Sequence, residues 1–226
     1  MSHHHDDLNS ISASPTPHGL IDRAIVSFDK GLRAIVPKSN PSTRPLPVNS
    51  DKMPELSITE SRHVAGLMRI NHTGEVCAQG LYHGQAVTAK SERVKQEMHH
   101  ASLEEIDHLV WCETRLSELG SHPSVFTPVW YGLSFGLGAV AGLVSEEFSL
   151  GCVAETEAQV SEHLQDHLTR LPEQDCRSRD ILTQMDIEEC EHRDMAIDQG
   201  GSVLPEPVRV TMRWLANRMK DVAYHL

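Results

Sequence analysis

One arrangement of glutamate and histidine occurs twice in the sequence. A single glutamate is followed, after 30 residues in the first copy and 32 in the second, by the motif Glu-x-x-His. The residues are Glu75, Glu105 and His108 in the first copy, and Glu157, Glu189 and His192 in the second. Single glutamates on two helices, with Glu-x-x-His on two others, form the ligand pattern of two-metal carboxylate sites in four-helix bundles. The sequence therefore predicts that these six side chains are metal ligands.

Residues typical of helix ends lie midway between the glutamates of each copy. Lys90 is halfway from Glu75 to Glu105 and stands beside Ser91, a good N-cap. Glu173 is halfway through the second copy and follows Pro172, a helix breaker. If the chain turns there, each copy forms an antiparallel hairpin, with each glutamate roughly 15 residues, or about 22 Å, from its turn. The four carboxylates then reach one level, and each histidine lies one turn further on the same face.

The alternative interpretation is that these motifs occur by chance. In a chain with 15 histidines, one Glu-x-x-His arises often by chance, but two copies at mirrored distances from helix breakers are much harder to obtain that way. The ligand register has an alternative. Glu104 and Glu188 precede the same histidines by four residues and share their face, but the i, i+3 spacing of the known pattern favours Glu105 and Glu189.

The ligand types indicate which metals to expect. Four carboxylates and two imidazoles favour iron or manganese, because a structural zinc site more often uses cysteine and histidine. Six side chains shared by two ions leave positions open for oxygen or water. Asp186 and His163 are candidates for orienting the imidazoles, and either is equally well an ordinary polar residue. Cys112 and Cys190 lie near the motifs, but we interpret them as small core residues.

Composition narrows the class of protein. A chain of 226 residues forms one domain, with or without appendages. Its net charge of −12 argues against nucleic acid as a partner. The five cysteines are odd in number and include no Cys-x-x-Cys pair, which suits free thiols in a reducing cytoplasm.

Hydrophobic periodicity and helix breakers predict an all-α chain. The expected helices cover residues 21–36, 59–89, 91–119, 131–171, 175–199 and 208–225, and a break near the glycines of the fourth is left open. Prolines mark residues 37–58 as a linker, and Pro123 and Pro128 mark a crossover. We therefore divide the chain into residues 1–58, with a polar tail, an amphipathic helix and a proline-rich linker, and a bundle domain at 59–226.

Residues 121–145 contain no aspartate, glutamate, lysine or arginine. A membrane-spanning helix is possible by length, but two prolines and the continuation toward Glu157 favour a bundle element. Its glycines at 132, 136, 138 and 142 would then allow close helix packing. A third alternative is that this surface dips into one leaflet of a membrane.

Basic amphipathic segments flank the acidic bundle. In the stretch 21–38, Arg23, Lys30, Arg33 and Lys38 outnumber two aspartates, and in 205–226, Arg209, Arg213, Arg218 and Lys220 outnumber two acids. Met212, Leu215, Met219 and Val222 line one side of the last helix, near Trp214. Such helices suit a membrane surface, and ordinary packing of a terminal helix on the bundle explains the pattern equally well.

Four local motifs resemble one family of enzymes. They are NHTGE at 71–75, EIDH at 105–108, VAETE at 153–157 with His163, and DIEECEH at 186–192. With them the chain resembles, from about Arg69 to its C-terminus, the demethoxyubiquinone hydroxylases, which are di-iron monooxygenases of ubiquinone biosynthesis. The resemblance implies a ferritin-like four-helix bundle that binds two iron ions per chain, with Glu105 and Glu189 bridging them.

The resemblance also implies the reaction and its partners. The family hydroxylates the ring of a polyprenylated demethoxyquinone or quinol, using O2 and a reductant, and binds peripherally to membrane. The long polar N-terminus and short linker suggest a bacterial form, which would lie on the cytoplasmic face of the inner membrane. A homo-oligomer and partner proteins of ubiquinone biosynthesis are left open.

Two rival functions share parts of this pattern. A ferritin-like protein that oxidises or stores iron would use the same ligands, but the uncharged stretch 121–145 and the basic, Trp-bearing end argue against it. A non-enzymatic helical adaptor, with its glutamates and histidines on a solvated surface, would bind no iron.

Overall fold

The computed structural model describes residues 29–49, 53, 55–89 and 91–226. Residues 29–35 are helical. The helices that follow are α2 (Ile58–Thr88), α3 (Glu92–Glu118), α4 (Thr127–Val144), α5 (Glu146–Arg170), α6 (Cys176–Asp198) and α7 (Glu206–Ala223). The described residues contain no strand, so the all-α prediction is confirmed. The expected polar tail and residues 21–28 of the first predicted helix lie outside the described residues.

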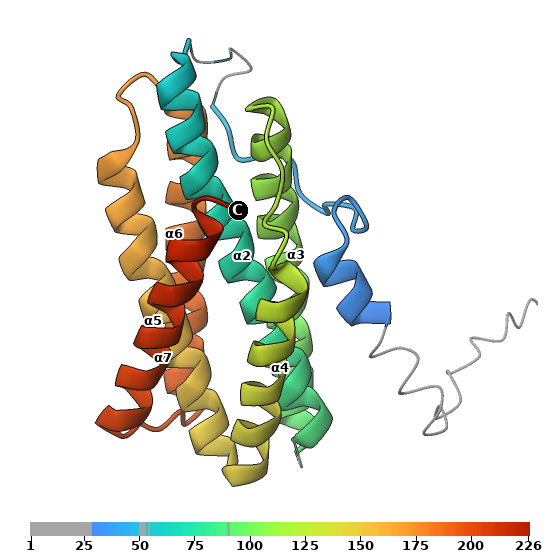
Figure 1. The fold of residues 1–226 in the computed structure, drawn as a ribbon. Helices are drawn as coiled ribbons and strands as arrows, with labels where there is room; N and C mark the ends of the chain where they lie inside the picture. Colours follow the sequence, from blue (N-terminus) through green and yellow to red (C-terminus); the bar gives the residue numbers. More distant parts are fainter. Residues whose placement is uncertain (1–28, 50–52, 54, 90) are drawn as a thin grey trace, which may run out of the picture.

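Four long helices, α2, α3, α5 and α6, form the bundle (Figure 1). Ser57 begins α2 with a capping box, in which its hydroxyl accepts from the Glu60 amide and the Glu60 carboxylate accepts from the Ser57 amide. The second hairpin turns after α5 ends at Arg170, close to Pro172 as the sequence predicts. The core at one end of the bundle includes Leu67, Trp111, Leu164 and Leu182, all buried.

The predicted helix at 131–171 is two helices, and the break left open near its glycines lies at Ser145, just after Gly142. The hydroxyl of Ser145 accepts a hydrogen bond from the Phe148 amide (3.1 Å) and so caps α5. The first of the two helices also begins earlier than predicted, because Pro128 occupies its first turn. Proline is tolerated there, since the N–H that it lacks would have no partner within the helix. The expected crossover is therefore largely the separate helix α4.

Glycines allow α4 to lie directly against α2. A methyl group at Gly138 would collide with the carbonyl oxygen of Leu81, and one at Gly142 with the hydroxyl of Thr88. On the facing helix, Gly84 meets the backbone of Phe135 in the same way. Close packing is thus confirmed for two of the four glycines, whereas Gly132 and Gly136 face open space.

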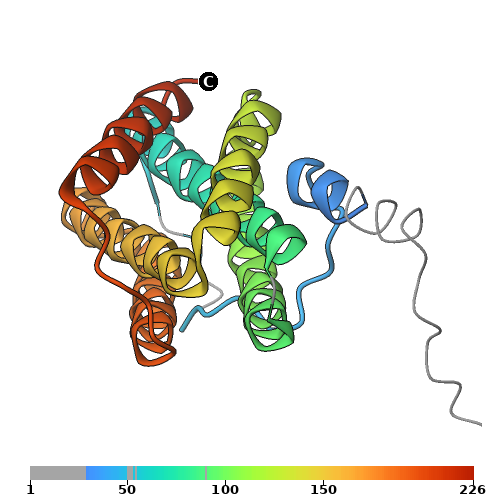
Figure 2. The same ribbon diagram turned by 90° about the horizontal axis from the view of Figure 1, so that it is seen from below.

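Helix α7 lies beside α2 and α5, as the end-on view shows (Figure 2). Met212 and Met219 of its apolar side are buried, in line with ordinary packing of a terminal helix. Trp214 and Val210 nevertheless remain 58% and 59% exposed. Helix α4 is the one described helix that is long and apolar enough to cross a membrane, and 22% of it is buried.

Candidate metal centre

The structure gathers all six predicted ligand residues inside the bundle. Glu75 comes from α2, Glu157 from α5, and one Glu-x-x-His motif comes from each of α3 and α6. Each side chain is buried, because the period of the helix turns these positions toward the bundle axis. The two antiparallel hairpins place them at one level, as the mirrored spacing predicts.

Short distances connect the members of this acid and histidine cluster. One ligand atom from each of Glu75, Glu105, His108 and Glu189 lies within 4.8 Å of the others. His108 Nδ1 is 3.0 Å from Glu105 Oε2 and 3.2 Å from Glu189 Oε1. His192 Nδ1 is 3.0 Å from Glu105 Oε1. Both imidazoles therefore turn the same nitrogen toward the carboxylates.

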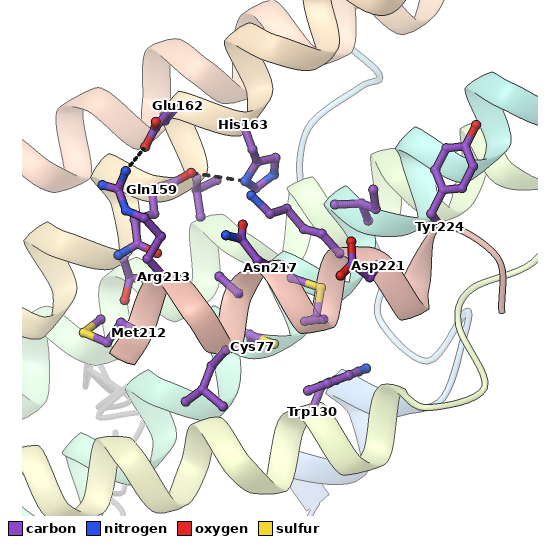
Figure 3. A pocket seen from close by; sticks show the side chains of 18 of the residues that line it. Cys77, Trp130, Gln159, Glu162, His163, Met212, Arg213, Asn217, Asp221 and Tyr224 are labelled. Carbon is purple, nitrogen blue, oxygen red and sulfur yellow. Dashed lines mark hydrogen bonds and ion pairs between the residues drawn. The ribbon is translucent and has the colours of Figure 1, made fainter. Parts of the chain in front are cut away.

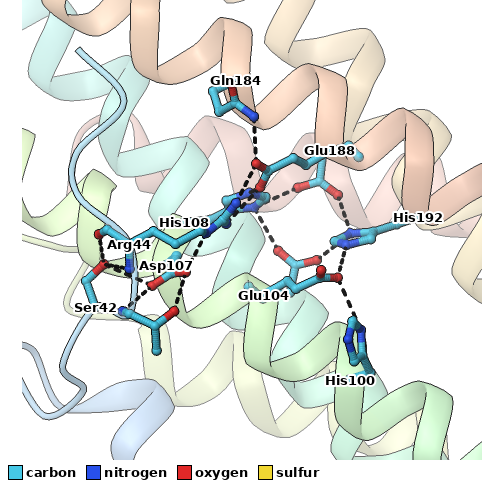
Figure 4. Close-up of polar contacts among 12 residues, drawn as sticks. Ser42, Arg44, His100, Glu104, Asp107, His108, Gln184, Glu188 and His192 are labelled. Carbon is cyan, nitrogen blue, oxygen red and sulfur yellow. Dashed lines mark hydrogen bonds and ion pairs between the residues drawn. The ribbon is translucent and has the colours of Figure 1, made fainter.

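Glu104 and Glu188 lie outside the cluster and contact the far side of the imidazoles (Figure 4). His108 Nε2 is 2.7 Å from Glu188 Oε2, and His192 Nε2 is 2.8 Å from Glu104 Oε2. Each histidine of one motif is thus paired with the residue that precedes the other motif. This crossed arrangement places Glu105 and Glu189 inside and gives their neighbours the orienting role.

The two residues proposed from the sequence for that orienting role do not fill it. The Asp186 carboxylate accepts from Ser161 Oγ (2.5 Å) and Gln165 Nε2 (3.3 Å). His163 is buried, and its Nδ1 bonds to the Gln159 carbonyl (3.2 Å). Of the two alternatives left open for them, these contacts favour ordinary polar residues, because the orienting partners come from the opposite helix.

Tyr82 is a site residue that the sequence analysis missed. It is fully buried on α2, and its hydroxyl donates a short hydrogen bond to Glu157. Tyr82 follows Glu75 by seven residues, which is two helical turns, so its position on the same face could have been noticed. The contact holds one oxygen of Glu157 and leaves Oε2 without a partner.

The electrostatics of the cluster fit a set of metal ligands. Burial and the nearby charges of Glu189 and Glu105 raise the pKa of Glu75 and that of Glu157 well above the usual range. Burial alone would lower the pKa of His192, but the carboxylates of Glu105 and Glu189 raise it to about 12. In the metal-free protein, protons thus offset the crowded negative charge.

Unpartnered oxygens are the clearest sign that the cluster suits cations. Glu75 Oε1 and Glu157 Oε2 are buried without a hydrogen-bond partner in the described structure. Buried carboxylate oxygens are normally satisfied, because an unpaired one costs desolvation energy. Two divalent cations would satisfy these atoms and balance four carboxylates.

A cavity of about 700 Å³ lies between α2, α4, α5 and α7 (Figure 3). Its wall includes Gly74 and Thr156, the sequence neighbours of two cluster glutamates. Apolar side chains from α4 and α7 line much of the rest, including Trp130, Leu137 and Met212. An apolar molecule could therefore reach the region of the cluster from between these two helices.

The cysteines do not join the cluster. Cys112 is buried in the apolar core with its Sγ 3.9 Å from Met185 Sδ, and Cys190 lies 3.5 Å from Ser161 Oγ. All five cysteines are free thiols. This placement agrees with their interpretation as small packing residues.

Comparisons with known proteins match most of the chain. A family model described as "Ubiquinone biosynthesis protein COQ7" covers residues 62–222. A "3-demethoxyubiquinol 3-hydroxylase" of Psychrobacter sp. (strain PRwf-1) is 75% identical over 207 residues, which are 92% of this chain and 97% of the relative. Proteins with that name from Psychrobacter arcticus and Acinetobacter baylyi are 73% and 54% identical, over 93% and 91% of this chain and 98% and 97% of the relatives.

Proposed function

The chain belongs to the COQ7 family of ubiquinone biosynthesis proteins, and we propose that it uses two iron ions to hydroxylate the ring of a polyprenylated demethoxybenzoquinol or quinone. Its relatives are named for this hydroxylation, and the resemblance seen in the four motifs is confirmed. The observation that carries the proposal is a buried set of four glutamates and two histidines with unpartnered oxygens.

The iron ligands in this proposal are the six predicted residues. Glu75, Glu105 and His108 would hold the ions from one hairpin, and Glu157, Glu189 and His192 from the other. Bound ferrous iron supplies the activation of O2, with electrons from an external reductant. The protein holds the imidazoles by their outer nitrogens and keeps the carboxylates in a dry interior, so that the ligands are in place before the metal arrives.

The cavity between α4 and α7 is the proposed route for the substrate. A polyprenyl tail is apolar, so its contact with Leu137, Met212 and Leu215 would remove both surfaces from water. The ring at the head of the tail would then lie toward Gly74 and Thr156, next to the cluster. His163, with its buried Nε2 unpartnered, lines the same cavity.

The same two helices support a proposal for where the protein works. Leu143 on α4 and Trp214 on α7 are 63% and 58% exposed, and α7 also carries Arg209, Arg213 and Arg218. Exposed apolar side chains beside basic ones suit binding to an anionic lipid surface. We propose peripheral binding without a spanning helix, on the cytoplasmic face of a bacterial inner membrane, where the substrate dissolves.

Deletion of the gene in its host tests the proposed function. The expected result is accumulation of a demethoxyquinone and loss of ubiquinone, both restored by the wild-type gene and not by a Glu189→Ala variant. Unchanged quinones in the deletion strain would contradict the proposal. If the deletion strain kept its quinones unchanged but retained less iron, the result would favour the storage alternative. The family assignment and the exposed apolar helix do not support that alternative.

A further inference from the structure

The proline-rich linker is fastened to two bundle helices. Residues 38–49, which we call the strap, run across α3 and α6 and lie outside the stretch matched by the family model. At one end the Lys38 amide donates to Glu113 Oε2 on α3 (2.8 Å). At the other the Asn49 amide donates to Asp180 Oδ2 on α6 (2.9 Å). Leu46 and Val48 pack against the apolar core.

The middle of the strap binds a residue inside the first metal motif. Asp107 is the third residue of Glu-x-x-His in α3 and is buried. Its carboxylate accepts from the Thr43 amide (2.7 Å), the hydroxyls of Ser42 and Thr43 (both 2.9 Å) and Arg44 Nε (2.7 Å). The corresponding residue of the second motif, Glu191, is exposed. The strap is therefore anchored to one copy of the motif.

Arg44 connects the strap to the metal centre (Figure 4). Its two terminal nitrogens donate to both oxygens of Glu188, at 2.7 and 2.9 Å, and its guanidinium lies 4.8 Å from the centre of the Trp111 ring. Gln184 donates to the same carboxylate (2.7 Å). Glu188 then bonds to His108 Nε2. A two-pronged contact of this kind fixes the plane of a carboxylate, which a single charge does not.

Among the described residues, the other imidazole has no comparable support. His192 Nε2 bonds to Glu104, whose side chain is 42% exposed and whose other partner is His100, 3.5 Å away and itself exposed. The Glu188 side chain is 12% exposed. The two outer carboxylates occupy equivalent places in the repeat, so this difference comes from the strap.

We propose that Arg44 is a positioning residue for the metal centre: by holding Glu188 against His108 Nε2, it makes the His108 position the better ordered of two unequal metal positions. The inference rests on the proposed function, because it needs that centre to bind metal. It assigns a role in the centre to a segment of chain far from the ligands in sequence. Partners outside the ligand set commonly change metal affinity 10- to 100-fold.

Anaerobic titration with Co(II), followed by its visible absorption bands, tests the proposal without relying on turnover. Wild-type protein is expected to bind two ions. Arg44→Gln should weaken one position on the order of tenfold and spare the other, and Arg44→Lys should restore only part of the loss because it lacks the planar fork. Arg33→Gln is the matched control, since Arg33 lies near the strap but pairs with exposed Asp29.

A double mutant separates action through Glu188 from a general structural role. If Arg44 acts through Glu188, Arg44→Gln/Glu188→Gln should bind Co(II) no more weakly than Glu188→Gln alone. Unchanged binding in Arg44→Gln, equal weakening at both positions, or a further loss in the double mutant would overturn the inference while leaving the proposed function intact. A wild-type protein that binds neither Co(II) nor Fe(II) would overturn both.

Discussion

Each histidine of the cluster lies between buried glutamates on its inner side and one more exposed glutamate on its outer side. His108 has Glu105 and Glu189 on one side and Glu188 on the other, and the tilt of the ring is set by both. The carboxylate that accepts from the outer nitrogen fixes the ring and directs Nδ1 toward the inner carboxylates. The residues inside the cluster and those outside it should therefore respond differently to substitution.

Alanine at Glu105 or Glu189 is expected to remove most of the iron and nearly all of the hydroxylation, because the proposed centre would lose one of its four buried carboxylates. Glu104→Gln keeps the shape of an outer residue and should retain both ions, with affinity reduced about tenfold or less. Iron content after gel filtration and hydroxylation activity, measured on each variant, test whether the inner substitutions are more damaging than the outer one. Full iron and turnover in Glu105→Ala would show that the ligand register is wrong.

His167 provides a prediction about pH at the scale of one residue. Burial lowers the pKa of His167 to about 2, and its Nδ1 lies 2.8 Å from Asn71 Oδ1. The unfolded imidazole gains a proton below pH ~6.5, whereas the folded one stays neutral. The free energy of unfolding therefore decreases as the pH falls through 6.5. For this group the decrease is about 1.4 kcal/mol at pH 5.5.

Urea unfolding at pH 7.5 and pH 5.5 measures that loss. His167→Gln should reduce the drop in unfolding free energy between the two pH values by about 1 kcal/mol, and His122→Gln, at an exposed position, should not. An equal drop in all three proteins would refute the assignment of this pH dependence to His167.

At the scale of helices, the contact between α4 and α2 depends on individual glycines. Gly138→Ala would force a methyl group against the Leu81 carbonyl, which is backbone and cannot turn away. We expect a loss of about 1–3 kcal/mol in unfolding free energy. Gly136→Ala, two residues earlier and facing open space, should instead stabilise the helix by up to ~1 kcal/mol. Thermal unfolding of the two variants tests the packing, and a similar midpoint in both would contradict it.

The helix ends show which boundaries could be predicted from the sequence. The predicted start at residue 59 and the break at Pro172 lie close to the observed ends of α2 and α5, because capping and breaking are local effects. The division between α4 and α5 was left open as a break near the glycines, and the structure places it at Ser145, which precedes Glu146 and Glu147 in the manner of an N-cap. Contacts that join distant segments, such as Arg44 with Glu188, leave no periodic trace and needed the structure.

At the scale of the whole molecule, a bundle with a polar interior site exposes apolar side chains on α4 and α7. Leu143→Ser and Trp214→Ser together should weaken binding to vesicles with anionic lipids, with part of the remaining binding lost at high salt. Ile197→Ser on α6, where Ile197 is 52% exposed, is the control. Protease sites found on opposite sides of the membrane, before and after α4, would instead establish a spanning helix.

The central claim is that the buried cluster places oxygen from O2 on a quinol ring, and isotope labelling tests it most directly. Purified iron-loaded protein is given a prenylated demethoxyquinol, a reductant and ¹⁸O2, and the product is analysed by mass spectrometry. The account predicts one ¹⁸O atom in the new ring hydroxyl, with the second oxygen atom leaving as water, and no product from Glu189→Ala. Product that carries oxygen from water, or equal product from Glu189→Ala, would contradict it.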